Sequence, residues 1–502
     1  NQWVRSVPET NILPLIYFAN VVAFQDADNE EARIGYIGKF NYNYKDKYYL
    51  ELSGRQDASW KFAPSKRKGF FPSGSIGWRI TEEDWYKNIA GEDAWVSEFK
   101  LRGSYGVLGD DDIGIGAYDY LPGYNYNTGT VILDGQPIVG ARDKGQIVDN
   151  ISWFKSKITD IGMDFTLFDG KINGSYDYFY RLRTGLRGRK YDILIPSELG
   201  YGLPDENVNS DAQSGFEGAL SYSDSFGDFN LTVSGNASYS RGKFIESYKP
   251  RFENSWQEYR ASNEGRFNDI RWGFNTIGQF QSQEEINNYP VDIDGQGNRT
   301  LLPGDLIYED LNGDGRINGY DEKPIGYNFG KQPSVNFGLS IRMAYKGFDF
   351  TSDFSGGSGY SWSQEWETRW AFQNQGAFNT IFLDSWSRQD PSDPNSAWNP
   401  GKYPALRYNA SYHSNYRGGQ ASSFWMHNVT YLRARTIELG YSLPKPILEK
   451  IGLQKARFYI NGYNLFSFDN LSKFGIDPEV NDTNGLQYPQ NKFVNVGVNL
   501  SI

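Results

Sequence analysis

The last ten residues, FVNVGVNLSI (Phe493–Ile502), alternate strictly between two kinds of side chain. One parity carries Val494, Val496, Val498, Leu500 and Ile502, and the other carries Asn495, Gly497, Asn499 and Ser501. Successive side chains of a β-strand point to opposite faces, so this pattern predicts a strand with one aliphatic face and one small polar face. The chain as a whole is polar, with a mean hydropathy of −0.63. A fully aliphatic strand face in so polar a chain indicates that this face lies against an apolar environment.

The same alternation recurs along the chain and is interrupted by short turn sequences. Tight turns are predicted at residues 45–47, 169–170, 225–227 and 346–347, each between two alternating stretches, which is typical of β-hairpins. About thirteen strands of about ten residues can be counted, and this length crosses a bilayer when the strand is tilted. Aromatic residues make up 17% of the chain and there are 55 glycines, a composition that favours pleated strands and turns. The sequence therefore predicts an all-β, antiparallel protein.

The connections between strands sort into very short turns and very long loops. Long loops are predicted near residues 109–152, 184–213, 242–333 and 357–428. Outer-membrane barrels have short periplasmic turns and long outside loops. We therefore expect residues 1–32 to form an outside loop before the first strand, and residues 33–502 to form the C-terminal part of a transmembrane β-barrel. A half-buried strand of a soluble β protein would explain any single stretch, but it would not explain the alternation of loop lengths.

In such a barrel the aliphatic face of Phe493–Ile502 would meet lipid and its polar face would meet the lumen. We expect this strand to close the barrel against the first strand. Because open sheet edges are not tolerated in lipid, about thirteen strands are expected to belong to a larger barrel or to need a partner segment.

Composition and motifs argue against other classes of protein. There is no cysteine, which removes disulfides, thiolate metal sites and cysteine nucleophiles. The net charge of −11 disfavours a nucleic-acid surface, which needs clustered Lys and Arg. No apolar run is long enough for a membrane-spanning helix. His413 and His427 are the only histidines and neither lies beside a nucleophile motif, so we do not expect an enzyme.

Several blocks of sequence occur in a characteristic order from about residue 33 to the C-terminus. They are NYNYKDKYYLELSGRQDAS, KGFFPSGSIGWRITEEDW, LRGSYGVLGDDDIG, PGDLIYEDLNGDGRIN, YKGFDF, LRARTIELGYSLPKPILEKIGL, INGYNLFSF and FGIDPEV. In this order they resemble the barrel of the SusC-like TonB-dependent transporters of the bacterial outer membrane. The resemblance implies a 22-stranded barrel with an N-terminal plug, energy coupling through TonB, and a SusD-like surface lipoprotein as a lid. No plug or TonB box is recognised in these residues, so contacts with TonB cannot be assigned to them.

The resemblance also implies a function. We expect a subunit that takes up oligosaccharides together with the lipoprotein, although some members of the family import oligopeptides instead. Two further hypotheses stay open, a passive porin or surface adhesin and a soluble glycan-binding β protein. A co-purifying lipoprotein would favour the importer, whereas solubility without detergent would favour the last.

The motif DLNGDGRINGYD has the spacing of a calcium-binding loop. Carboxylate, amide and carbonyl oxygens at positions one, three, five, seven, nine and twelve are the ligands that calcium prefers, and a glycine at position six allows the sharp turn. The final position is Asp where Glu is usual, and an Asx-rich turn that caps itself is the alternative. The predicted ligands of a structural Ca²⁺ are Asp310, Asn312, Asp314, Arg316 (through its carbonyl), Asn318 and Asp321.

Tryptophans are concentrated in two of the predicted outside loops. Sugar rings stack on aromatic faces, so these residues are candidates for contacts with substrate, while packing of the loops or a partner interface are the alternatives. In SWSQEWETRW three tryptophans are spaced four residues apart, and on a helix they would form one stripe. The candidates are Trp256, Trp272, Trp362, Trp366, Trp370, Trp386 and Trp398.

Overall fold

The computed structural model describes residues 31–502, with gaps at 92–93, 117, 144, 146, 191–195, 197, 199–201, 249–251, 328–332, 373–378, 408–420, 481–483 and 489. The predicted outside loop at residues 1–32 lies outside the described residues except for its last two.

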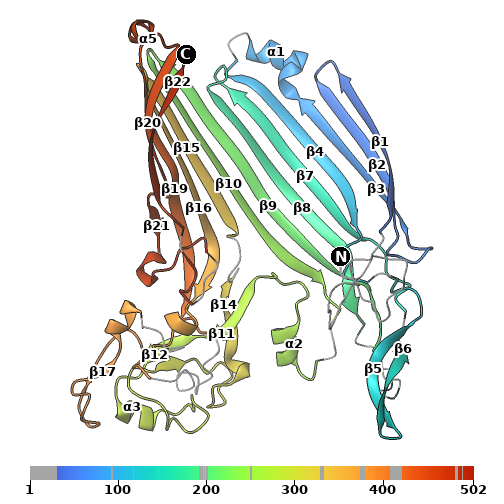
Figure 1. Ribbon diagram of the computed structural model, residues 1–502, viewed down its shortest axis with the longest axis vertical. Helices are drawn as coiled ribbons and strands as arrows, with labels where there is room; N and C mark the ends of the chain where they lie inside the picture. Colours follow the sequence, from blue (N-terminus) through green and yellow to red (C-terminus); the bar gives the residue numbers. More distant parts are fainter. Residues whose placement is uncertain are drawn as a thin grey trace, which may run out of the picture.

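One antiparallel sheet dominates the described residues, and its strands follow one another in sequence order (Figure 1). Thirteen strands form this path, which confirms the prediction of about thirteen. They are β1 (Arg33–Tyr44), β2 (Tyr48–Ser59), β3 (Lys68–Arg79), β4 (Val96–Asp110), β7 (Phe154–Leu167), β8 (Ile172–Arg189), β9 (Asp205–Phe226), β10 (Phe229–Glu246), β15 (Val335–Tyr345), β16 (Phe348–Ser363), β19 (Met426–Ser442), β20 (Lys455–Tyr463) and β22 (Phe493–Ser501).

Tight turns join pairs of strands at one end of the sheet. At the first, Lys45 and Asp46 have φ angles of 53° and 54°, and the Asn43 side chain accepts a hydrogen bond from the Asp46 N–H at 3.0 Å. Two successive residues with positive φ give a turn whose twist matches that of the flanking strands. Phe168 and Asp169 repeat this geometry with φ angles of 52° and 54°. Two turns predicted from the sequence therefore form where expected.

The two faces of the sheet follow the alternation of the sequence. In β22, Val498 lies opposite Phe458 of β20, and Val496 lies opposite Ile460. Val496 is 81% exposed, so this side chain has little protein cover. The predicted aliphatic face of the last strand therefore continues across its neighbour as an exposed apolar surface.

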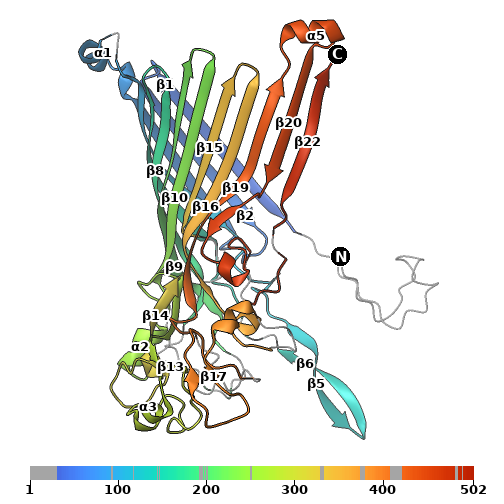
Figure 2. The same cartoon turned by 90° about the vertical axis from the view of Figure 1, so that its left-hand side faces the viewer.

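The sheet is open. β22 pairs with β20, β1 pairs with β2, and within the described residues no pairing joins β1 to β22. The expectation that the last strand closes the barrel against the first is therefore wrong for this chain. Thirteen strands paired in sequence order form a curved wall, and Figure 2 shows its two edges standing apart with a concave face between them.

Short elements fill the connections. β21 (Ser467–Asp469) pairs with β19, and four small sheets form from β5 (Tyr124–Leu133) with β6 (Gln136–Asp143), β11 (Ile270–Phe274) with β14 (Glu322–Tyr327), β12 (Thr276–Gln279) with β13 (Leu306–Tyr308), and β17 (Ser387–Arg388) with β18 (Trp398–Asn399). Short helices in the connections include α1 (Asp84–Ala90), α2 (Ser255–Ala261), α3 (Gln283–Asn288), α5 (Lys445–Ile451) and the 3₁₀ helices η4 (Gly319–Asp321), η5 (Trp366–Thr368) and η8 (Ser472–Phe474). In the part of the chain that the structure describes, none of the helices is long and apolar enough to span a membrane.

The long connections lie together at the end of the sheet opposite the tight turns (Figures 1 and 2). β8 and β9 extend further than the sequence suggested, so the loop between them covers residues 190–204 and not 184–213. The other long connections cover residues 111–153, 247–334 and 364–425, close to their predicted bounds.

Candidate functional site

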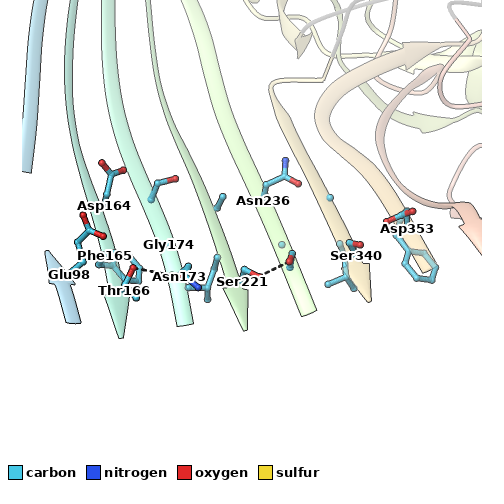
Figure 3. A pocket seen from close by; sticks show the side chains of 18 residues that line it. Glu98, Asp164, Phe165, Thr166, Asn173, Gly174, Ser221, Asn236, Ser340 and Asp353 are labelled. Carbon is cyan, nitrogen blue, oxygen red and sulfur yellow. Dashed lines mark hydrogen bonds between the residues drawn. The ribbon is translucent and has the colours of Figure 1, made fainter. Parts of the chain in front are cut away.

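A row of small polar side chains crosses the concave face of the sheet. The register places Thr166 beside Asn173, Asn173 beside Ser221, and Ser221 beside Ser234. The row continues through Ser340 to Asp353. Cross-strand hydrogen bonds join Thr166 to Asn173 at 3.0 Å and Ser221 to Ser234 at 2.8 Å. A hollow of about 680 Å³ lies along this row (Figure 3).

Charged side chains flank the row toward β4. Arg102 reaches Asp177 at 2.6 Å, Asp164 at 3.1 Å and Asp160 at 3.8 Å. All four belong to the same sheet parity as the polar row, because Arg102 and Asp177 both lie opposite Gly162 in the ladder. One guanidinium thus holds three carboxylates on the concave face.

A second ionic cluster joins β19 to the connection that follows η8. Arg433 bonds Asp477 at 2.6 Å and Glu479 at 2.9 Å, and Arg435 also bonds Glu479. Burial opposes ionisation of Asp477, but hydrogen bonds from Arg433 and from the backbone N–H groups of Glu479 and Gln490 outweigh it and lower its pKa. The acids come from FGIDPEV and the arginines from YLRARTIELGYSL. The sequence showed both blocks, but it did not show that they meet.

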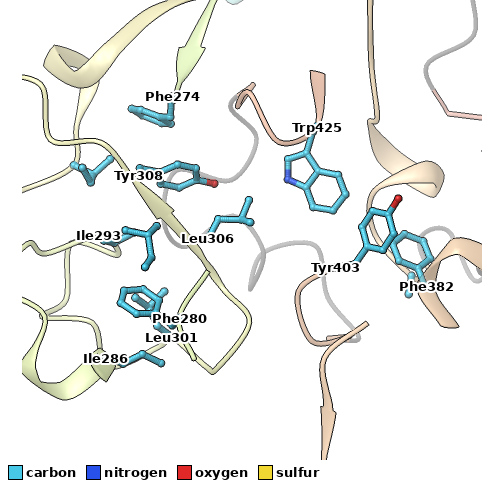
Figure 4. Packing of buried hydrophobic residues seen from close by; sticks show 13 residues of the cluster. Phe274, Phe280, Ile286, Ile293, Leu301, Leu306, Tyr308, Phe382, Tyr403 and Trp425 are labelled. Atoms are coloured by element: carbon cyan, nitrogen blue, oxygen red, sulfur yellow. The ribbon is translucent and has the colours of Figure 1, made fainter. Parts of the chain in front are cut away.

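The two longest connections fold into one cap with a shared core. Figure 4 shows Phe274, Leu306 and Tyr308 from residues 247–334 near Tyr403 and Trp425 from residues 364–425. Burial raises the pKa of Tyr308 to about 12. The core is apolar and rich in aromatic rings, so the cap has a defined structure of its own at the end of the sheet opposite the tight turns.

The predicted tryptophans fall into separate places in and around this cap. Trp256 on α2 and Trp272 on β11 belong to one partly exposed cluster, in which Tyr259 contacts Trp256 at 5.5 Å and Trp272 at 5.3 Å between ring centroids. Guanidinium groups cover Trp272, since Arg260 lies 4.8 Å and Arg266 5.6 Å from its ring centroid. These rings pack mainly against one another and against arginines.

The SWSQEWETRW stripe does not form. Trp362 is the last residue but one of strand β16 and Trp366 begins the 3₁₀ helix η5, so the segment is not one α-helix. Trp362 is buried and stacks on His427. Trp370 is also buried, whereas Trp366 is 50% exposed and meets Trp370 edge-on at 5.5 Å. Of this group Trp366 therefore offers the most ring surface to a ligand.

Trp386 and Trp398 pack at the edge of the cap. Trp386 is buried against Gly304, where a Cβ atom would lie 2.3 Å from the ring and where φ is +90°, so only glycine fits. The guanidinium of Arg388 lies over the Trp398 ring, 4.6 Å from the ring centroid.

The predicted calcium loop folds as a compact turn beside the aromatic cluster. Both carboxylate oxygens of Asp310 accept backbone N–H groups, from Gly313 at 2.8 Å and from Gly315 at 2.9 Å. Asp321 is fully buried and accepts N–H groups from Leu311 and Asn318 at 2.9 and 2.7 Å.

The remaining predicted ligands bond one another. Asp314 accepts from the Arg316 N–H and the Asn312 side chain at 2.9 and 3.0 Å, and from the Asn318 side chain at 3.4 Å. Among the described residues no group of three or more His, Cys, Asp or Glu side chains is arranged to hold a metal. Calcium binding at this loop stays a prediction.

Comparison with known proteins gives relatives in sequence, while no family model matches. TonB-dependent receptor P3 of Formosa agariphila is 27% identical over 481 residues, which cover 91% of this chain and 43% of the receptor. TonB-dependent receptor P26 of the same organism is 25% identical and covers 100% of this chain and 48% of the receptor. TonB-dependent receptor SusC of Bacteroides thetaiotaomicron is 25% identical and covers 89% of this chain and 41% of SusC.

Solved structures share the fold. The RagAB peptide importer in the open-open state superposes with a TM-score of 0.67 at 18% identity, over 96% of this chain and 48% of the matched chain. The closed-closed state gives 0.64 at 19% identity, over 94% and 48%. This chain thus spans a little under half the length of the proteins it matches.

Sequence and fold agree on a β-barrel protein of the bacterial outer membrane. The resemblance of this chain to the SusC-like TonB-dependent receptors of that membrane is therefore confirmed.

Proposed function

We propose that this chain forms part of the barrel wall and the outside loops of an active importer, which works with TonB and a SusD-like surface lipoprotein. The observation that carries the proposal is the two-faced curved sheet, which is polar and ionic on the concave side and apolar and exposed on the convex side. A wall of this kind separates lipid from a wet passage. The relatives are named receptors and the structural neighbours importers, which supports transport and not catalysis.

We favour oligosaccharides as the substrate. The row from Thr166 to Asp353 offers hydroxyl and amide groups that can exchange hydrogen bonds with sugar hydroxyls, and only Asp353 at its end is charged. At the outside end, the exposed ring of Trp366 is suited to stacking on the C–H face of a sugar. Similarity to SusC is in keeping with this choice.

An oligopeptide is the second candidate. The solved neighbours are described as a peptide importer. The ionic groups of the concave face, such as Arg102 with its three carboxylates, could pair with charged peptide ends.

The test starts from the full natural protein, extracted from outer membranes in detergent together with whatever binds it. Neutral oligosaccharides and mixed oligopeptides are then titrated separately against the complex, with binding measured by calorimetry. The proposal expects a co-purifying surface lipoprotein and binding of oligosaccharides. Binding of peptides alone would establish the second candidate.

Energy coupling needs a separate measurement. Uptake of the bound ligand is compared in cells with and without TonB, and the proposal expects uptake to stop when TonB is absent. Uptake that continues at the same rate would show a passive porin, and a chain that folds without detergent would contradict the membrane assignment.

A further inference from the structure

The short helix α1 carries two large apolar side chains that have little protein cover. Trp85 is 51% exposed and Ile89 is 81% exposed. They are four residues apart, so they lie on one side of the helix. Tyr86, on another side, donates a hydrogen bond to the Val96 carbonyl at 3.0 Å, which ties the helix to the start of β4. The Trp85 ring meets the Tyr86 ring edge-on at 6.0 Å, so the apolar side of α1 lies beside this attachment and keeps the exposure given above.

The start of α1 is fixed to the convex side of the sheet. Glu83, which caps the helix, accepts hydrogen bonds from the Tyr48 hydroxyl and from the Trp78 indole N–H, the latter at 3.0 Å. Tyr48 and Trp78 lie opposite each other in the ladder, and Ile76, two residues before Trp78, is 66% exposed on the same apolar face. Figure 2 shows α1 projecting outward from the curved sheet at the end with the tight turns.

More exposed aromatic surface lies near the same end. Trp95 and Phe168 are 62% and 48% exposed, and their rings contact each other at 5.9 Å. Trp and Tyr are preferred at the boundary between hydrocarbon and headgroups, because their rings are apolar and their N–H or O–H groups reach water. The apolar side of α1 is thus next to a surface that already faces lipid.

We propose that α1 lies in the headgroup region of the periplasmic leaflet, with Trp85 and Ile89 inserted. The surface that α1 contacts is a zwitterionic phospholipid. The charges around α1 favour this lipid over an anionic one. Glu82 pairs with Lys87 at 2.6 Å, while Asp84 and Glu83 share Lys47 at 3.0 and 3.7 Å. Both lysines are thus occupied by these three acids, so their attraction to anionic lipid does not contribute. The anchor holds by apolar burial and fixes the height of the barrel wall in the bilayer. This inference rests on the proposed membrane insertion of the sheet.

This chain holds no cysteine, so a cysteine introduced here is unique within it. Single variants Ile89→Cys and Lys87→Cys are made in the full natural protein, with any cysteine outside these 502 residues first replaced by serine. They are then spin-labelled and reconstituted into phosphatidylcholine vesicles. Collisions of each label with oxygen, which dissolves in lipid, and with a water-soluble nickel chelate are measured by electron paramagnetic resonance. Ile76→Cys, on the lipid-facing part of β3, reports whether the barrel has inserted.

We expect the Ile89 label to favour oxygen over the nickel chelate several-fold more than the Lys87 label does, and to lose this preference in detergent-free unfolded protein. Equal access of the nickel chelate to both labels would overturn the anchor. Shielding of the Ile89 label from both reagents would also overturn it, because a protein partner would then cover α1. If the Ile76 label does not favour oxygen, the membrane assignment itself fails. All three labelled positions are exposed, so the substitutions should not prevent folding. The mobility shift of the folded barrel on unheated gels checks that each variant has folded before its label is measured.

Discussion

Arg407 donates two hydrogen bonds to Asp305, at 2.7 and 2.6 Å, and so joins the two longest outside connections across 102 residues of sequence. The side chains are 8% and 0% exposed. Burial raises the pKa of Asp305, and the guanidinium of Arg407 opposes this rise by stabilising the carboxylate. The pair is therefore a buried ionic tie of the cap, in addition to its apolar core and to hydrogen bonds such as that from the Ser423 N–H to the Phe274 carbonyl.

Removal of one partner of this pair should destabilise the cap. In Arg407→Leu, Asp305 stays buried without its cation, and we expect a loss of about 3–5 kcal/mol of cap stability. The double variant Arg407→Leu with Asp305→Leu should recover most of this loss, because no unpaired charge remains. Limited proteolysis of the reconstituted protein measures both, and equal resistance of the single variant and the wild type would contradict the prediction.

Asp294 should make the cap sensitive to acid. It accepts hydrogen bonds from the backbone N–H groups of Gln296, Asn298 and Thr300, at 2.7, 2.8 and 2.8 Å. Burial opposes its ionisation, but these bonds and the Thr300 hydroxyl lower its pKa. The pKa of an aspartate in the unfolded chain is about 3.9, and the folded pKa of Asp294 is lower. The ionised carboxylate therefore stabilises the loop fully above a pH of about 3.9, and this stabilisation is lost as the pH falls through the folded pKa.

We expect Asp294→Asn to lower local stability by about 2 kcal/mol at neutral pH, with a smaller difference from the wild type below about pH 4. Hydrogen exchange of residues 295–301, corrected for the intrinsic effect of pH, checks this. A difference that does not depend on pH would show that the carboxylate charge has no part in it.

The predicted calcium loop can be tested with one exposed ligand. The Asn312 side chain lowers the pKa of Asp314 through a hydrogen bond, so this carboxylate is ionised at neutral pH and available to a cation. If the loop binds Ca²⁺, calcium should raise the melting temperature of the protein, and Asp314→Asn should remove the rise by taking away one charged oxygen ligand.

The matched control for this test is Asp390→Asn. Asp390 also sits in an Asx turn, where it accepts the Ser392 N–H at 2.9 Å, but it is outside the calcium spacing. The control should keep the full response to calcium. The absence of any response in the wild type would leave the loop as a self-capped turn.

Trp366 and Trp370 should respond differently to loss of their rings. Trp366 has a φ of +52°, a conformation that costs a non-glycine residue about 1 kcal/mol, so Trp366→Gly removes an exposed ring without backbone strain. We expect this variant to fold normally and to bind oligosaccharide about tenfold more weakly, a loss of about 1.4 kcal/mol.

Trp370→Ala instead empties a buried site and should cost about 3–5 kcal/mol of stability. Thermal unfolding and calorimetric titration of both variants separate the two effects. Unchanged binding in Trp366→Gly would remove this ring from the substrate path.

Local pattern was sufficient for most of the sheet. The alternation at Phe493–Ile502 predicted which side chains of β22 are apolar and exposed, because the pleat of a strand assigns faces residue by residue. The short polar break at Lys45-Asp46-Lys47 predicted a hairpin, because it separates two alternating stretches with no room for a longer connection. The lengths of the connections predicted which end of the sheet carries the loops.

Contacts between distant segments were decided only by the tertiary structure. The pairing of Arg433 with Asp477 and of Arg407 with Asp305 depends on how whole connections fold, and many alternative ion pairs have similar local energies. The helical spacing of the tryptophans in SWSQEWETRW likewise did not decide the conformation of this segment. Packing in the cap did, because Trp362 belongs to β16 and Trp370 is buried. Whether β22 meets β1 depends on the curvature summed over twelve strand pairings, which no single stretch of sequence contains. The sequence by itself thus determined the faces, the turns and the order of the strands, whereas the tertiary structure decided the open edge, the cap and the ion pairs that join them.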